Sequence, residues 1–240
     1  MDRILLIDKP SGMTSFGVVS RIRRVLTAEM KEEYRSKGED APKRLKVGHS
    51  GTLDPFATGL LIILVGKATK KANEFLKLDK EYIAEIELGC TSSTGDIEGE
   101  IQKTGNSKRE LSYQDVKDVV ESFLGEIEQR VPTYSAVKIN GERAYKLARR
   151  GKDFTTPTRK VKIYGIEIES YNYPKLAIKT KVSSGTYIRT LGEDIGKKLG
   201  VGAYLTNLRR TQIGAYRVED AVRLEDFLRE ESGKRGTSLI

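Results

Sequence analysis

The sequence contains one cysteine and one histidine among its 240 residues. A disulfide within the chain needs two cysteines, so a disulfide framework is excluded. An ordinary zinc site built from Cys and His is excluded as well, because such a site takes several of these side chains. Scarce cysteine is typical of proteins kept in a reducing compartment, and we expect the protein to be cytoplasmic.

Long apolar runs are also missing. The longest, Leu60 to Val65, has the length of a strand and is far shorter than the ~18 residues of a membrane helix. The N-terminus, MDRILLIDKP, carries acids and a proline where a secretory signal has an apolar region, so we expect neither a signal peptide nor a membrane partner. Hydrophobic residues still make up 38% of the chain, which excludes disorder of the whole chain.

Motifs that bind common cofactors are absent. The Gly-Lys pair at the end of residues 59–67 has the wrong spacing for a phosphate-binding loop. Gly200 and Gly202 lack the third glycine of a dinucleotide-binding turn, and neither GxSxG nor HExxH occurs. We therefore expect an enzyme with this sequence to use no metal and no cofactor, as hydrolases, isomerases and lyases driven by side chains do.

Positive charge is in surplus, with 43 Lys and Arg against 34 Asp and Glu and a net charge of +9. A surplus of this sign favours a polyanionic partner such as nucleic acid.

Hydrophobic periodicity predicts a mixture of strands and helices. Strands are predicted at residues 3–8, 60–65, 82–88, 161–169, 176–183 and 185–190, and helices at 15–26, 68–78, 112–123, 141–151 and 191–199. Residues 27–46 are dense in both charges and predict a solvated loop or a frayed helical extension. Because strands outnumber helices and often follow one another, we expect an α+β fold.

The sequence GHSGTLDPFATG at residues 48–59 predicts a loop with Asp54 at its apex, since Asp-Pro is a turn-forming pair. Considered alone, this loop is more readily interpreted as a plain connection than as a site.

Five blocks in order resemble the TruB-type tRNA pseudouridine synthases. They are LIDKPSGMTS, GHSGTLDPFATGL, KEYIAEIELGCTSSTGDIEG, YSAVKINGERAYKLARRG and SSGTYIRTLGEDIGKKLGVGAYLTNLRRT, which span nearly all of residues 3–230. The resemblance implies the pseudouridine synthase fold, an α+β fold with a mixed, mostly antiparallel central sheet flanked by helices. It also implies a basic mobile insertion at about residues 132–160.

The resemblance implies three catalytic residues. Asp54 matches the nucleophilic aspartate, Tyr82 an active-site tyrosine, and Arg189 the arginine that pairs with the aspartate. Pseudouridine formation breaks the bond between C1′ and N1 and rejoins the base through C5, so it needs no cofactor. The aspartate can attack either C1′ or the base, and Tyr82 can either transfer a proton or pack beneath the base.

Three further residues match the substrate-binding positions of the family. Tyr187 contacts the base, Leu208 forms an apolar wall of the uridine pocket, and His49 fills the space in the RNA that the flipped uridine leaves. A lone histidine is more often structural than catalytic, and the resemblance assigns His49 to RNA contact and not to acid–base chemistry.

The implied partner is the T stem-loop of tRNA, with uridine 55 as the target. Eight basic residues and one acid, Asp153, lie between Arg143 and Lys162. They form either a solvated basic helix or a lid over the RNA, and the resemblance favours the lid. The expected RNA-binding residues are Lys9, Lys70, Arg149, Arg150 and Arg209.

We expect one catalytic domain over residues 1–230, a loose tail over 231–240, a monomer, and no required protein partner. The chain ends at Ile240, so the C-terminal PUA-like domain usual in bacterial relatives is expected to be missing. The alternative function is a non-catalytic tRNA-binding or tRNA-folding chaperone on the same fold. A glycosidase is disfavoured, because the loop around Asp54 holds no second carboxylate.

Overall fold

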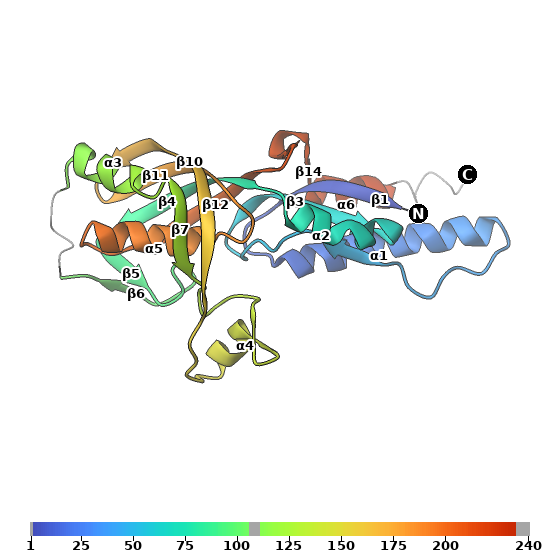
Figure 1. The fold of residues 1–240 in the computed structure, drawn as a ribbon. Coiled ribbons are helices and arrows are strands. Elements are labelled where there is room, and N and C mark those ends of the chain that lie inside the picture. The colour runs from blue at the N-terminus through green and yellow to red at the C-terminus, as the bar shows by residue number, and fades with distance from the viewer. Residues whose placement is uncertain (1, 106–110, 234–240) are drawn as a thin grey trace. The chain divides into compact units, whose positions relative to one another are not determined.

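The computed structural model describes residues 2–105 and 111–233, and Figure 1 colours them from the N-terminus to the C-terminus. The chain divides into two compact units. The first contains the residues up to Leu78 together with those from Arg209 onward, and the second contains Asp79–Leu208. The two units are described in turn.

Strand β3 (Thr58–Val65) is central to the first unit. It pairs antiparallel with β1 (Arg3–Lys9) along one edge and with β2 (Val47–His49) along the other. The C-terminal part of β12 (Ala203–Ile213) runs parallel to the start of β3, and β13 (Tyr216–Arg217) pairs antiparallel with the end of β12. A short strand, β14 (Val222–Arg223), runs parallel to β1.

Helices cover both faces of β3, which explains its continuous apolar run. Side chains at 61, 63 and 65 pack with α1 (Ser15–Ser36) and α6 (Leu224–Gly233). Side chains at 60, 62 and 64 pack with Phe75 of α2 (Ala72–Leu76), with Ile213 and with Val218 of η2 (Val218–Asp220). The 3-10 helix η1 (Gly66–Lys71) joins β3 to α2.

Helix α1 continues to Ser36, well beyond the last residue of the predicted helix, and residues 37–46 form the connection to β2. Of the two interpretations of residues 27–46, the helical extension is therefore correct up to Ser36. Met30 is buried in the core, and the ion pairs Arg35–Glu32 and Lys37–Glu33 support the last turns.

The second unit contains an antiparallel sheet in the order β4-β11-β10-β7. Its strands are β4 (Lys80–Leu88), β11 (Lys175–Val182), β10 (Thr158–Asn172) and β7 (Gly125–Arg130). Tyr82, Ala84, Ile86 and Leu88 are buried on one face of β4, as the alternation in the sequence predicted. The part of β12 up to Leu208 lies beside β4.

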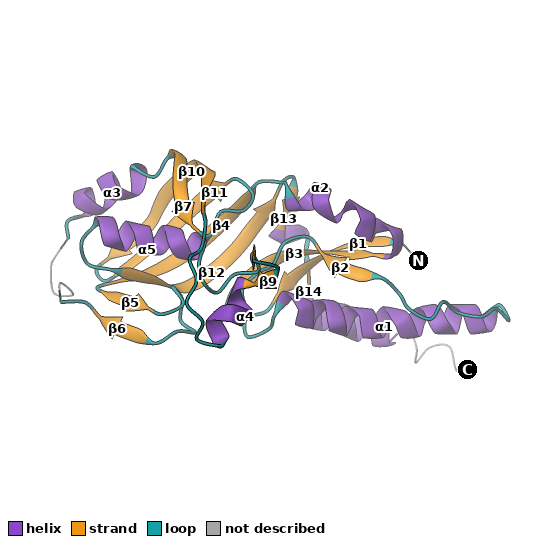
Figure 2. Cartoon of the chain, turned by 60° about the horizontal axis from the view of Figure 1, so that its bottom comes forward, coloured by secondary structure: helices purple, strands orange, loops and turns teal. Residues whose placement is uncertain are grey.

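Three helices and two small hairpins complete the described part of the second unit. Figure 2 shows α3 (Tyr113–Glu121) and α5 (Ile188–Lys198) next to each other beside the sheet. One hairpin joins β5 (Cys90–Ser92) to β6 (Ile101–Lys103). The other joins β8 (Lys138–Ile139) to β9 (Glu142–Arg143) and leads into α4 (Ala144–Arg149).

The predicted strand at residues 185–190 is wrong, because Ile188–Thr190 forms the first turn of α5. Gly185 has a φ of +87° and lies in a turn in which the Thr186 hydroxyl donates to the Ser183 carbonyl, so the extended chain ends there. Ile188 of this segment is instead buried at helical spacing with Leu191 and Ile195 of α5.

The predicted tail at residues 231–240 begins too early. Glu231 is buried within α6, and residues 234–240 lie outside the described residues.

No element was predicted for β7, β12 or α6. The expected α+β class with mostly antiparallel strands is confirmed. Among the described residues, no helix combines the length and apolar composition that a membrane span requires.

A side chain at Gly59 should destabilise the protein. Gly59 has a φ of +102°, and a Cβ there would lie 2.3 Å from the Arg210 backbone oxygen. Gly51 has a similar φ of +105°, but its Cβ would meet nothing closer than 3.8 Å. We expect Gly51→Ala to lower the free energy of unfolding by about 1–2 kcal/mol through strain alone. Gly59→Ala should lower it by about 1–3 kcal/mol more, because β3 and β12 must separate.

Urea unfolding of the two variants measures this difference. An equal loss of the free energy of unfolding in both variants would show that the close approach of β12 to Gly59 does not affect stability.

Candidate functional site

Asp54 lies in a turn between β2 and β3. The Ala57 amide donates to the Asp54 carbonyl at 3.2 Å, with Pro55 at the second position of the turn. Leu53 and Phe56 on either side are buried, whereas Asp54 is only half-buried. The apolar neighbours therefore anchor the turn and leave the aspartate at the surface of its unit.

The segment that leads into α1 holds this turn from the side. The Ser15 hydroxyl donates to the Leu53 carbonyl at 2.9 Å and accepts from the Leu53 amide at 2.8 Å. The Gly12 amide donates to the Pro55 carbonyl at 2.9 Å. These bonds fix the backbone on both sides of Asp54.

Lys9 lies beneath the same turn, which corrects its expected role in binding RNA. Its side chain is fully buried, and its ammonium donates to the carbonyls of Met13, Pro10 and Pro55 at 2.7, 2.9 and 3.1 Å. A buried charge needs such partners to offset its desolvation. Lys9 therefore organises the turn and presents no surface to a ligand.

Arg210 is a second buried cation that holds the backbone of this loop, near its start. It is 1% exposed, and its guanidinium donates to the Leu60 carbonyl at 2.8 Å and to the Gly51 carbonyl at 3.2 Å. His49 lies at the end of β2 and is half-buried. Burial and the nearby Arg210 charge lower the pKa of His49, which favours the neutral imidazole.

The two other RNA-binding candidates of the first unit differ in their surroundings. Lys70 is exposed in η1, next to Lys67 and Lys71. Arg209 makes a bidentate ion pair with Asp8, at 2.7 and 3.1 Å, and is still 37% exposed. A phosphate at Arg209 would therefore have to compete with the Asp8 carboxylate.

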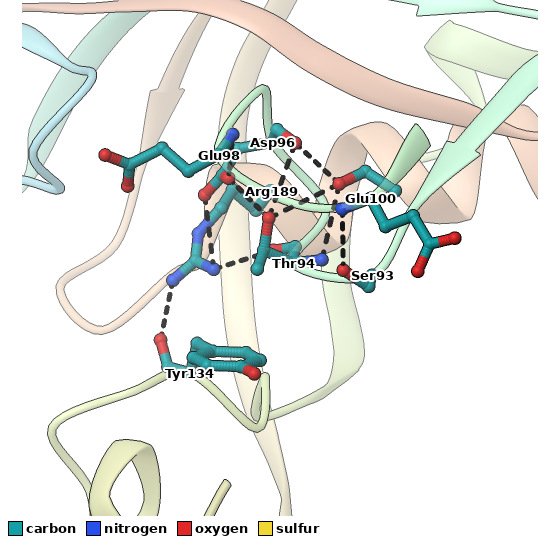
Figure 3. Close-up of polar contacts among 8 residues, drawn as sticks. Ser93, Thr94, Asp96, Glu98, Glu100, Tyr134 and Arg189 are labelled. Atoms are coloured by element: carbon teal, nitrogen blue, oxygen red, sulfur yellow. Dashed lines mark hydrogen bonds and ion pairs between the residues drawn. The ribbon is translucent and has the colours of Figure 1, made fainter. Parts of the chain in front are cut away.

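In the second unit, Arg189 extends from the first turn of α5 into a dense polar cluster (Figure 3). One nitrogen, Nη1, lies 3.5 Å from Asp96 Oδ2 and donates to the Thr94 carbonyl at 2.8 Å. The other, Nη2, donates to the Tyr134 carbonyl at 2.8 Å. Both Arg189 and Asp96 are almost fully buried, so one guanidinium joins α5 to two separate loops.

Asp96 was not among the residues singled out from the sequence. The Thr94 hydroxyl donates to its Oδ1 at 2.5 Å, and the Glu98 amide donates to the same oxygen at 3.0 Å (Figure 3). These donors and Arg189 give the buried carboxylate of Asp96 its hydrogen-bond and ion-pair partners. The available signal was an acid within the otherwise small and polar run CTSSTGD.

Tyr187, directly before α5, is held by a residue that the sequence analysis also missed. The fully buried Gln129 of β7 donates to the Tyr187 carbonyl at 3.2 Å and accepts from its amide at 3.0 Å. The Arg159 guanidinium lies 5.3 Å from the centre of the Tyr187 ring. Tyr82 and Leu208 are buried in β4 and β12, at 8% and 5% exposure.

The basic insertion follows β7 and contains β8, β9 and α4. Figure 1 shows the segment with α4 beyond the end of β7. The Val131 amide donates to the Pro157 carbonyl at 3.0 Å and closes its base. Arg149 is exposed and lies 5.7 Å from the Tyr145 ring centre, whereas Arg150 pairs with Glu142 at 2.7 Å.

The candidate residues thus form two groups. His49 and Asp54 lie in the first unit, whereas Tyr82, Tyr187, Arg189 and Leu208 lie in the second. Among residues 2–105 and 111–233, no three His, Cys, Asp or Glu side chains gather as a metal site would require.

Comparison with known proteins identifies the family. Residues 39–188 match the TruB family pseudouridylate synthase (N terminal domain), and residues 189–235 match the tRNA pseudouridylate synthase B C-terminal domain. The chain belongs to the TruB family.

Two TruB relatives, each named tRNA pseudouridine synthase B, come from Phocaeicola vulgatus and Aquifex aeolicus. Both are 42% identical to this chain, over 224 and 234 residues. The alignments cover 93% and 97% of this chain and 91% and 75% of the relatives. These matches confirm the predicted enzyme class, an isomerase that converts uridine to pseudouridine in tRNA.

Solved structures support the fold. A Cbf5-Nop10-Gar1 complex matches 99% of this TruB chain with a TM-score of 0.72 and 28% identity. An H/ACA RNP bound to a substrate RNA containing 2′-deoxyuridine matches with a TM-score of 0.69 and 26% identity. This chain spans only 56% of each chain that it matches there, and the protein partners named in those complexes belong to those proteins.

The lowered pKa of His49 is directly measurable, because this TruB chain has one histidine and its ring signal needs no assignment. In a protein without a histidine tag, we expect a folded-state pKa below the ordinary value of 6.5 and a value close to 6.5 in urea. Neutral His49 is favoured by folding, so its contribution to stability is full above about pH 6.5 and declines as the pH falls.

Proton NMR of the imidazole between pH 4 and 8 makes the measurement. A folded-state pKa at or above the unfolded one would contradict the described burial of His49.

Proposed function

We propose that this protein isomerises uridine 55 in the T loop of tRNA, with Asp54 as the nucleophile. The observation that carries the proposal is the GHSGTLDPFATG loop, inside a family match that extends over residues 39–235. The rigid turn supports it, because a nucleophile held by Leu53 and Pro55 loses little freedom when it reacts.

The reaction itself explains the choice of residue types. Breaking the C1′–N1 bond leaves an electron-poor sugar carbon, which a carboxylate can attack or stabilise. The base then turns and rejoins through C5, so the product has the composition of the reactant. Attack of Asp54 on C1′ and attack on the base are both compatible with this role.

Arg189 supplies the cation in this proposal. Its guanidinium is positioned before substrate arrives, because Asp96, Thr94 and Tyr134 hold it. A charge fixed in advance stabilises an anion without reorganisation during the reaction. The pairing of Arg189 with Asp54 stays a prediction.

The target uridine must leave its stack to react, so we expect base flipping. Tyr187 and Leu208 then form walls for the flipped base, and His49 fills the space left in the RNA. Lys70 and the exposed Arg149 are the strongest candidates for phosphate contacts, since Lys9 is buried and Arg209 and Arg150 have acidic partners. The cytoplasmic location, the monomeric state and the independence from protein partners stay predictions.

Tritium release from C5-labelled uridine in an unmodified tRNA transcript tests the function. We expect release with the wild type and none with Asp54→Asn, which keeps the size of the side chain but removes its charge. Asp40→Asn, at an exposed position in the connection after α1, is the matched control and should behave as the wild type.

Tight tRNA binding without release by the wild type would instead favour the chaperone alternative. Release by Asp54→Asn at the wild-type rate would refute the role of Asp54.

Replacing Tyr82 by Phe separates its two possible roles. We expect the single-turnover rate to fall by about 10²-fold with tRNA affinity unchanged, because a positioned proton donor or acceptor contributes on that order. Tyr164→Phe, on the exposed part of β10, is the control. A near-normal rate would assign Tyr82 to packing beneath the base.

A further inference from the structure

The first half of α1 carries positive charge without any acid. Residues 15–28 contain Arg21, Arg23 and Arg24, and the first acid of the helix is Glu29. Arg21 and Arg24 are exposed and Arg23 is half-buried. Within the part of the chain that the structure describes, none of the three has an ion-pair partner.

The second half of the same helix is different. Arg35 pairs with Glu32 at 3.0 Å and Lys37 at its end pairs with Glu33 at 2.7 Å. Lys31 in this half also lacks an ion pair among the described residues, but every arginine of α1 that lacks one lies in the turns nearest the Asp54 loop. Unpaired arginines that repel one another are stabilised by an anionic partner.

An exposed aromatic ring lies beside these arginines. Phe16 is 65% exposed, the highest fraction among the large apolar side chains of the described residues. The inward face of α1 is already filled by Val18, Val19, Ile22 and Leu26, so Phe16 adds nothing to the core. The Arg23 guanidinium lies 5.6 Å from the Phe16 ring centre, within the range of a cation–π contact.

This surface is joined to the Asp54 turn by short covalent and hydrogen-bonded links. Phe16 follows Ser15, whose hydroxyl both donates to and accepts from the backbone of Leu53. Leu53 directly precedes Asp54. The backbone that carries the ring and the backbone that carries the aspartate are therefore held together within the first unit.

We propose that Phe16, Arg21, Arg23 and Arg24, here called the α1 platform, bind the substrate RNA outside the uridine pocket. Phe16 stacks on an unpaired base, and the three arginines contact phosphates. An aromatic ring next to unpaired arginines matches the two surfaces of a nucleic acid loop, flat bases and a charged backbone. The inference rests on the proposed function, and it adds a contact that selects and orients the RNA.

Binding of an unmodified tRNA transcript at several salt concentrations tests the platform. R21Q/R23Q/R24Q should weaken binding at least tenfold and lower the slope of log Kd against log salt by about 2–3, since each lost phosphate contact removes ~0.9 from the slope. The matched control is K31Q/R35Q/K37Q, which removes three charges from the other end of α1. Its affinity should stay within twofold of the wild-type affinity, and its salt slope should stay close to the wild-type slope.

The stacking role has its own variants. Phe16→Ala should weaken binding about tenfold without changing the salt slope, because stacking releases no counterions. Phe16→Tyr should restore the affinity. Equal melting temperatures of the wild type and both variants would exclude loss of fold.

Wild-type affinity and salt slope in R21Q/R23Q/R24Q would overturn the proposal. An equal loss of affinity in the K31Q/R35Q/K37Q control would overturn it as well, because the loss would then reflect net charge alone. Binding decides the platform whether or not isomerisation occurs. Absence of tritium release by the wild type counts only against the proposed function.

Discussion

Hydrogen bonds from buried cations to backbone carbonyls are the interaction on which the rest of this structure depends. Lys9 and Arg210 are both buried in the first unit. Lys9 donates to the Pro55 carbonyl in the loop that carries Asp54 and to two carbonyls just before α1, and Arg210 donates to the Gly51 carbonyl in the loop and to the Leu60 carbonyl in β3. Such charge-assisted bonds are each worth ~1.5–3 kcal/mol, and leaving one unmade costs a comparable amount. The loop has few alternative conformations that satisfy both cations at once.

Arg189 repeats the arrangement in the second unit. It binds two carbonyls and the Asp96 carboxylate, and so brings one helix and two loops to a common point. Gln129 holds the adjacent Tyr187 by its backbone. Asp54, Tyr187 and Arg189 therefore lie on segments whose backbone or side chain is held by polar groups, whereas Tyr82 and Leu208 lie within sheet strands. Under the proposed function, this arrangement contributes positioning and fixed charge to the reaction.

Much of this could be predicted from the sequence where local pattern and structure coincide. The alternation in β4, the double-sided burial of β3 and the Asp-Pro turn follow from residue types within a few positions of one another.

The role of Lys9 could not be predicted, because a lysine in a basic chain suggests a solvent-exposed side chain and its three carbonyl partners come together only in the fold. Asp96 and Gln129 were missed for the same reason, since their partners lie 93 and 58 residues away in Arg189 and Tyr187. The start of α5 was missed because β-branched residues favour strands locally, and packing overrode that preference.

The bond from Arg189 to the Tyr134 carbonyl gives the basic insertion a mechanical link to the polar cluster at α5. Tyr134 lies close to the point where the insertion leaves β7, so a displacement there must either stretch this bond or carry the guanidinium with it. A buried donor left without its acceptor costs ~1–3 kcal/mol. The position of the insertion and the position of the Arg189 side chain are therefore thermodynamically linked. The linkage is reciprocal: a contact that holds the insertion in place also restrains Arg189, and a contact that binds Arg189 also restrains the insertion.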